Sequence, residues 1–288
     1  MFNRKSYIIN SNLHQIQDKW QMNEKELLLL LDFAIKLAKQ GGLTAKAFLG
    51  QTRTEHKDDN SPVTQADFIV QDKIISEIIE HFPQHAIIAE EADSRKANID
   101  YKNAEFIWII DPIDGTRNFA RGIPIFCCSI ALLHKGSPII AAIYEANFDW
   151  LFTATQKHNS ELNGQPIFVN KDTFSSRTVL AYSVDTCKPV PVKLRELFNE
   201  CVFRNFGSAA LHLAMTAAGM IDGVLNFSGK LWDIAAGALI VKQAEGIIAP
   251  IEDNGKSIWP IDIENYNNEP VQLCAGNSKI VKFVREYE

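Results

Sequence analysis

The sequence lacks an excess of positive charge and a paired cysteine motif. Its 288 residues include 29 lysines and arginines against 35 aspartates and glutamates, which gives a net charge of -6. Nucleic-acid backbones are bound by basic surfaces, so we expect no nucleic-acid partner. The five cysteines are an odd number and include no C-x-x-C pair, which argues against the common zinc and redox motifs.

Long apolar runs are also missing. Residues 1–20 read MFNRKSYIINSNLHQIQDKW, which is too polar for a signal peptide. The leucine run from Leu27 to Leu31 is interrupted by Asp32 and Lys36, whereas about 20 apolar residues are needed to span a bilayer. We therefore expect a cytoplasmic protein without a membrane partner.

What the sequence does have is a hydrophobic content of 46%, enough to bury an extensive core in one large domain or two closely packed ones. Residues 1–22 show no periodicity and are expected to form an N-terminal extension. The pattern resets in a polar stretch between Asn170 and Arg177. We therefore expect an α+β half over residues 23–172 and an α/β half over residues 173–288.

Helix and strand signals alternate along both halves. A first helix is predicted to begin after Asn23, with Glu26 completing the start signal, and to end at Gly41 and Gly42. A second helix is predicted to end at Pro83. Further helices are predicted in VKLRELFNECV, AALHLAMTAAG and WDIAAGALIVKQAEG, and strands in AIIAEE, FIWIID, FCCSIALLHKG, SPIIAAIYEA, WLFTAT, TVLAYSV, VLNF, IIAP and VQLCAG, with LNGQPIFVN as a turn.

Two aspartates interrupt the stretch FIWIIDPIDGTRNF where its apolar strand ends. Asp111 and Asp114 would repel each other unless a cation lies between them. Mg²⁺ takes carboxylate ligands, and two such ions about 3.5–4 Å apart can clamp both oxygens of a phosphoryl transfer. The backbone N–H groups of Gly115 and Thr116, before a short helical segment, would then hold the phosphate.

Other acidic residues lie at element ends, and each also has an ordinary structural explanation. Thr64 and Asp67 have the spacing of a helix capping box. Glu90 would fit a solvated turn, and Asp233 would complement a helix dipole. His212 has no partner at ligand spacing and is interpreted as a packed or surface helix residue, and no H-E-x-x-H or G-x-S-x-G pattern occurs.

Four segments in this order, VTQAD, AEE, WIIDPIDGTRNF and LWDIAAGALIVKQAEG, resemble the signatures of the inositol monophosphatase family of Mg²⁺-dependent phosphomonoesterases. The resemblance covers nearly the whole chain from about residue 24 onward. It implies a layered αβαβα fold, commonly a homodimer, and sensitivity to Li⁺. It also implies hydrolysis of a small phosphorylated metabolite, such as an inositol monophosphate or a related sugar or polyol phosphate, without a covalent phosphoenzyme.

The resemblance assigns metal ligands residue by residue, for two to three Mg²⁺ ions in the site. It implies that Glu90, Asp111 and the Ile113 carbonyl bind one ion. Asp111, Asp114 and Asp233 would bind a second. A third, weaker ion would use Glu90 again, together with Asp67.

The resemblance also implies catalytic and substrate-binding residues. Thr116 paired with Asp67 would orient and deprotonate the attacking water, together with Glu90. The substrate contacts that it implies are Asp114, Gly115, Thr116, Gly207, Ser208, Ala209 and Asn226.

The substrate is the least defined part of this prediction. Asn226 stands where inositol-hydrolysing members carry a glutamate that contacts sugar hydroxyls. Histidinol phosphate or a nucleotide 3′-phosphate are therefore alternatives within the superfamily. Haloacid-dehalogenase-like phosphatases share a similar Asp-Gly-Thr motif, but two residues rather than one separate the acids here. A non-enzymatic regulatory role is a further alternative, since some bacterial family members associate with transcription machinery.

Overall fold

The computed structural model describes residues 22–51, 54–56, 62–91, 101–185, 188–252 and 257–287. Most of the predicted N-terminal extension and Cys187 lie outside these described residues. Among the described helices, none has the length and apolar character needed to cross a membrane.

The first sheet has the strand order β3-β4-β5-β6-β7-β8-β9. Only β3 and β4 pair in parallel, and the remaining neighbours are antiparallel. The predicted strands of this half and the hairpin around Gly136 are confirmed. The bounds are β3 Ala86–Ala89, β4 Phe106–Asp114, β5 Cys127–His134, β6 Ser137–Glu145, β7 Trp150–Thr155, β8 His158–Leu162 and β9 Gln165–Pro166.

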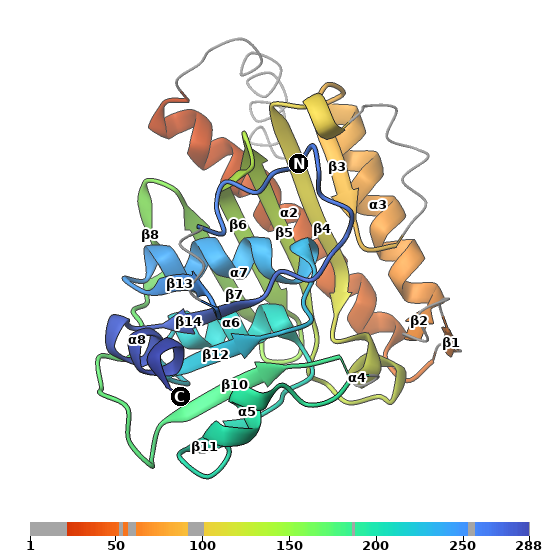
Figure 1. The fold of residues 1–288 in the computed structure, drawn as a ribbon. Coiled ribbons are helices and arrows are strands. Elements are labelled where there is room, and N and C mark those ends of the chain that lie inside the picture. Colours follow the sequence, from red (N-terminus) through yellow and green to blue (C-terminus); the bar gives the residue numbers. More distant parts are fainter. Residues whose placement is uncertain are drawn as a thin grey trace.

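Helices α2 (Glu24–Phe48) and α3 (Gln65–His81) cover the outer face of this sheet (Figure 1). The predicted start of α2 is confirmed, since the Glu26 N–H donates to Asn23 Oδ1 at 3.0 Å and the Asn23 N–H donates to Glu26 Oε2 at 2.8 Å. These reciprocal bonds satisfy two of the free donors at the helix end.

The predicted end of this helix at Gly41 and Gly42 is wrong, because α2 continues to Phe48. Both glycines are buried inside the helix. A Cβ on Gly41 would lie 2.6 Å from Cys128 Sγ, and one on Gly42 would lie 2.7 Å from the Tyr144 ring. The glycines therefore let the helix approach β5 and β6 closely, and this packing outweighs their preference for helix ends.

The second sheet has the order β11-β10-β12-β14-β13, with parallel pairs around β10 and antiparallel pairs around β14. The helix predicted in VKLRELFNECV is shorter than expected, because it ends at Leu197 and residues 202–204 form an edge strand. Helix α8 and the small β1–β2 hairpin were not predicted. The bounds are β1 Thr54–His56, β2 Pro62–Thr64, β10 Val179–Ser183, α5 Val192–Leu197, β11 Val202–Arg204, β12 Gly223–Asn226, β13 Ile247–Pro250, β14 Leu273–Gly276 and α8 Ser278–Glu286.

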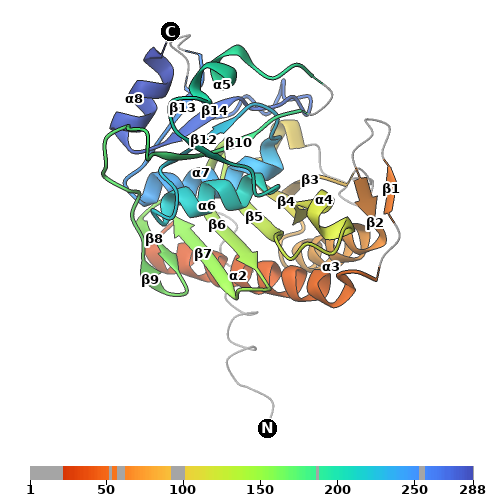
Figure 2. The same ribbon diagram turned by 90° about the horizontal axis from the view of Figure 1, so that it is seen from below.

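Helices α6 (Ala209–Ala217) and α7 (Leu231–Gln243) lie between the two sheets, while α5 and α8 lie outside the second sheet (Figure 2). The layered αβαβα arrangement is thereby confirmed. The predicted boundary at residues 172 and 173 falls between β9 and β10. One hydrophobic cluster joins Ile109 of the first sheet, Leu239 of α7 and Val224 of the second sheet, so the division into two halves stays a prediction.

Candidate metal centre

A β-bulge at the end of β4 brings Asp111 and Asp114 to the same side of the strand. Asp111 pairs with Ser129 and Asp114 pairs with Cys127, so two intervening residues on β4 face one on β5. Residues three apart point to opposite faces of a regular strand, and the extra residue of a bulge reverses that alternation. Pro112 fits in the bulge because it has no N–H to donate to the ladder.

Asp233 joins this pair from the first turn of α7. One carboxylate oxygen from each of Asp111, Asp114 and Asp233 lies within 4.8 Å of the others. Asp111 and Asp114 are buried and Asp233 is partly buried. The Asp233 side chain is held by the Lys230 N–H, which donates to its Oδ2 at 2.7 Å. The structure therefore gathers three of the predicted metal ligands from two separate layers of the fold.

The cluster carries more negative charge than a buried site tolerates. Burial raises the pKa of Asp111 well above its ordinary value, and the charges of Glu90, Asp114 and Asp233 raise it further. Burial, with the charges of Asp114 and Glu90, raises the pKa of Asp233 in the same way. Uptake of a proton by Asp111 or Asp233 would relieve this repulsion. A hard divalent cation such as Mg²⁺ would replace that proton, so the donor set fits it.

The N-terminus of α6 holds Asp114 in place. The Ser208 hydroxyl and the Ala210 N–H donate to Asp114 Oδ2 at 2.5 and 2.6 Å, and the Ala209 N–H donates to Oδ1 at 3.3 Å. Ser208 also caps the helix by accepting from the Leu211 N–H at 3.2 Å. Burial raises the pKa of Asp114 to about 6, and the bonds from Ser208 and Ala210 oppose this rise. Ser208 and Ala209, predicted to contact substrate, thus bind a carboxylate of the cluster, and both also line the neighbouring cavity.

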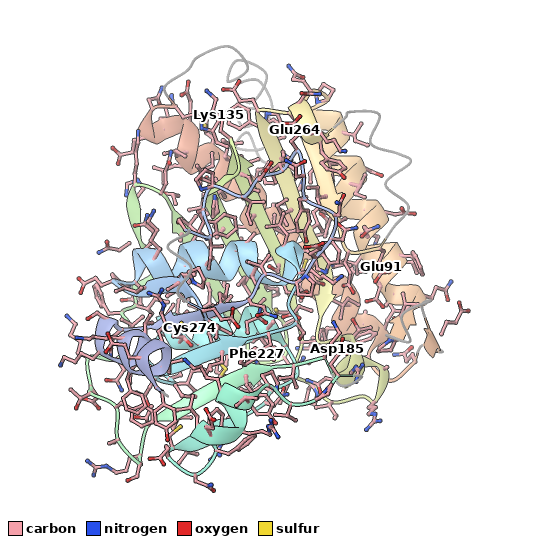
Figure 3. The ribbon with its side chains drawn as sticks, in the orientation of Figure 1. Glu91, Lys135, Asp185, Phe227, Glu264 and Cys274 are labelled. Atoms are coloured by element: carbon pink, nitrogen blue, oxygen red, sulfur yellow. The ribbon has the colours of Figure 1, made fainter. Side chains whose placement is uncertain are left out.

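Glu90 follows the last residue of β3, and hydrogen bonds to its own backbone and to that of Glu91 fix its position. Its N–H donates to the Ile110 carbonyl at 3.1 Å, next to Asp111. The Gln71 side chain of α3 donates to the Glu91 carbonyl at 2.7 Å and accepts from the Glu91 N–H at 2.9 Å. Figure 3 shows Glu91 beside α3. Gln71 was missed in the sequence, although a polar residue on the core-facing stripe of a helix is a signal that could have found it.

Gly115 and Thr116 start the short helix α4 (Thr116–Ala120) directly after the bulge. Gly115 has φ +103°, and a Cβ there would lie 3.0 Å from the Ile125 carbonyl, so only glycine fits. The Thr116 hydroxyl donates to the Ile113 carbonyl at 3.0 Å. The pairing of Thr116 with Asp67 that the resemblance implies is therefore not made in this structure.

Asp67 lies at the start of α3 and is fully buried. Its Oδ2 accepts from the Thr64 N–H at 2.8 Å and from the Thr64 hydroxyl at 2.7 Å. The capping-box interpretation is confirmed. His212 is likewise a packed residue, since its Nε2 accepts from the Phe206 N–H at 2.9 Å and its Nδ1 lies 3.2 Å from Ser183 Oγ.

A cavity of about 1630 Å³ opens beside the carboxylates. Glu90, Asp114, Gly115, Thr116 and Asp233 all contribute to its lining, and so does Gly207. The cavity therefore gives a small molecule access to the carboxylate cluster.

Asn226 is not among the residues that line this cavity. It is 1% exposed, its Nδ2 donates to the Val271 carbonyl at 2.9 Å, and its Oδ1 accepts from the Gly229 N–H at 3.1 Å. Its side chain thus fixes the turn after β12, whereas the sequence-based prediction was a contact with substrate.

The model of the inositol monophosphatase family matches residues 26–280. The Nus factor SuhB of Escherichia coli K12 is 36% identical over 266 residues, which cover 88% of this chain and 93% of that protein.

Solved structures of a suhB protein and of an inositol monophosphatase are also similar to this chain. The suhB protein of Bartonella henselae has a TM-score of 0.78 and 28% identity, covering 89% of this chain and 96% of that one. An inositol monophosphatase from Anabaena (Nostoc) sp. PCC 7120 has a TM-score of 0.74 and 28% identity, covering 90% and 94%.

The bond from Ser208 to Asp114 can be tested by substitution. Ser208→Ala should weaken Mg²⁺ binding about tenfold, because a hydrogen bond to a charged group contributes about 1.5–3 kcal/mol and orients the carboxylate. Ser208→Thr keeps the hydroxyl and should retain most of the affinity. Titration calorimetry with Mg²⁺ measures the effect. Asn277→Ala removes a comparable cap from α8 and should lower stability alone; unchanged Mg²⁺ affinity in Ser208→Ala would contradict the assignment.

The raised carboxyl pKa values predict how stability depends on pH. For Asp114 the pKa is about 6 in the folded protein and 3.8 ordinarily, so the folded state binds the proton more tightly. Without metal, the protonation of Asp114 therefore stabilises the folded protein. This stabilisation is complete below the ordinary pKa and is lost as the pH rises through the pKa of the folded protein. Mg²⁺ replaces the proton, so the increase in Tm that it causes should grow from about pH 4 to about pH 7. Calorimetric scans with and without Mg²⁺ measure this, and a pH-independent increase would be the opposing result.

Proposed function

The chain belongs to the inositol monophosphatase family, and we propose that it hydrolyses a small phosphate monoester in a Mg²⁺-dependent reaction. The substrate class we propose is an inositol monophosphate or a related sugar or polyol phosphate. The observation that carries the proposal is the convergence of Asp111, Asp114 and Asp233 beside a large cavity. Histidinol phosphate and nucleotide 3′-phosphates remain alternatives with the same chemistry.

Acidic residues alone would repel a phosphate, so the site needs cations to attract it. When bound, Mg²⁺ would draw charge from the phosphate and lower the pKa of the attacking water. We propose two to three ions, held by Asp67, Glu90, Asp111, the Ile113 carbonyl, Asp114 and Asp233.

The protein's own groups would bind the phosphate, position the attacking water and accept its proton. The backbone N–H groups of Gly115 and Thr116 would hold the phosphate at the start of α4. Thr116 would position the attacking water, and the carboxylates of Asp67 and Glu90 would accept its proton. The Thr116 hydroxyl would have to turn from the Ile113 carbonyl towards Asp67, which would leave that carbonyl available as a ligand.

Replacing Asp111 tests the proposed chemistry. Asp111→Asn should lower Mg²⁺-dependent phosphate release by roughly 10³-fold, since one shared ligand charge is lost. The metal-free variant should be at least as stable as the wild type, because the substitution relieves repulsion inside the cluster. The measurements are phosphate release from a panel of small phosphomonoesters and calorimetric unfolding.

The exposed Asp262 gives the matched control, since Asp262→Asn removes an equal charge outside the cavity. It should keep wild-type rates. Wild-type turnover by Asp111→Asn would count against a metal-dependent reaction at this cluster.

A regulatory binding role is the second candidate, because the Escherichia coli relative is named a Nus factor. The two candidates differ in one observable. If the wild-type protein releases no phosphate from any compound of the panel in the presence of Mg²⁺, the binding role is favoured.

We also propose a homodimer, for which the Phe148 patch, formed by Ile123, Phe148 and Trp150, offers a surface. Ile123 and Phe148 are 40% and 56% exposed, and the Phe148 ring stacks on Trp150 with centroids 5.0 Å apart. Asn147 Nδ2 donates to the Pro124 carbonyl at 3.5 Å, which links the two loops of the patch. Exposed apolar groups of this kind often mark a protein interface. Li⁺ inhibition and a cytoplasmic location also stay expectations.

Light scattering can test the dimer. The wild type should have twice the mass of one chain, and Phe148→Glu should have the mass of one chain because it places a charge in the interface. Phe68→Glu alters a phenylalanine on α3 that is 43% exposed and should stay dimeric. A monomeric wild type, or a dimeric Phe148→Glu variant, would refute the patch.

A further inference from the structure

The cavity has a second wall of a different chemical character. The carboxylates come from the first sheet and from α7, whereas the second wall is formed by residues at the ends of second-sheet strands and at the start of α5, with charged side chains such as Asp185, Lys193 and Glu196 among them. Its apolar members, called the apolar wall here, are Val184, Pro191, Val192, Phe227 and Ile251. A polyol has hydroxyl groups on all sides and would make little use of such a wall.

The cavity is also larger than a small polyol phosphate requires. Its volume of about 1630 Å³ exceeds the roughly 300–1,000 Å³ of ordinary small-molecule sites. Val192 in the apolar wall is 57% exposed, although the hydrophobic effect favours covering such a side chain. The cavity therefore combines a large volume with an exposed apolar side chain, and both belong to the cavity that the carboxylates line.

Phe227 is the one aromatic residue in the described lining. Its N–H donates to the Ser183 carbonyl at 2.9 Å, which fixes its backbone against the end of β10. Its side chain packs on the core cluster that includes Leu225 and Ile251, stays partly exposed and lines the cavity. Figure 3 labels Phe227 and Asp185, which line the same cavity and follow the paired strands β12 and β10.

The turn after Phe227 is rigid. Asn226 binds both Val271 and Gly229, and the Val271 N–H donates back to the Gly229 carbonyl at 2.8 Å. The backbone that carries Phe227 is therefore fixed before any substrate binds, which lowers the entropic cost of binding against its side chain.

We propose that Phe227 is a specificity-determining residue that favours phosphate monoesters whose leaving group carries a planar apolar ring. This inference rests on the proposed phosphatase function and concerns the substrate class of the same site. A planar group bound against Phe227 gains stacking and apolar burial, while the phosphate lies at the carboxylate cluster. A leaving group made only of hydroxyl-bearing carbons gains neither.

A matched pair of substrates isolates this effect. Adenosine 2′-monophosphate and methyl riboside 2-phosphate share the same secondary alkoxide leaving group and differ in the planar base. The wild type should have a kcat/KM about 5- to 100-fold higher for the nucleotide, mainly through KM, in line with base stacking on an aromatic side chain. Equal kcat/KM values for the two compounds would overturn the proposal.

Variants separate stacking from core packing. Phe227→Ala and Phe227→Leu should reduce the ratio of kcat/KM for the nucleotide to kcat/KM for the riboside to about one, and Phe227→Trp should keep the wild-type ratio. Phe203→Ala is the control, since Phe203 packs on the same core cluster but does not line the cavity. It should leave the preference unchanged. An equal loss for both substrates in Phe227→Ala would show a purely structural role.

The proposed function can fail separately from this inference. If neither compound releases phosphate with Mg²⁺, the phosphatase proposal fails, and titration calorimetry with the same two compounds then decides the role of Phe227. Tighter binding of the nucleotide by the wild type, lost in Phe227→Ala, supports the inference. Equal binding of the two compounds contradicts it.

Discussion

Repulsion between buried carboxylates is the constraint on which the rest of the site depends. One carboxylate oxygen from each of Asp111, Asp114 and Asp233 lies within 4.8 Å of the others, and the burial of Asp111 and Asp114 weakens the screening of their charges by water. Burial and mutual repulsion raise the pKa values of Asp111 and Asp233, so without metal the cluster favours bound protons. A divalent cation removes the conflict and gives the site an attraction for phosphate. The stability of the cluster and the proposed chemistry therefore have one physical origin.

The fold keeps the carboxylates together through contacts from several layers. The bulge in β4 orients Asp111 and Asp114, and the first turn of α7 supplies Asp233. The α6 N-terminus holds Asp114, and Gln71 of α3 fixes the segment that carries Glu90. Because these elements are also core elements, the ligands are attached to rigid parts of the molecule.

Local patterns made much of the fold predictable. The strands of the first sheet, the start of α2 and the motif at Asp111 all follow from short segments whose meaning does not depend on distant contacts. The failures have tertiary causes. Gly41 and Gly42 resemble a helix end until Cys128 and Tyr144 are seen against them. The donors around Ser208 and the amide of Asn226 serve partners that only the folded chain brings close.

The central claim is that the three carboxylates bind divalent cations. Anomalous X-ray scattering from crystals soaked in Mn²⁺, which scatters anomalously and takes the same oxygen ligands as Mg²⁺, tests it most directly. The account predicts at least one strong peak between Asp111, Asp114 and Asp233, with carboxylate oxygens of all three at coordination distance. Crystals at neutral pH whose carboxylates remain close together without any such peak would contradict it.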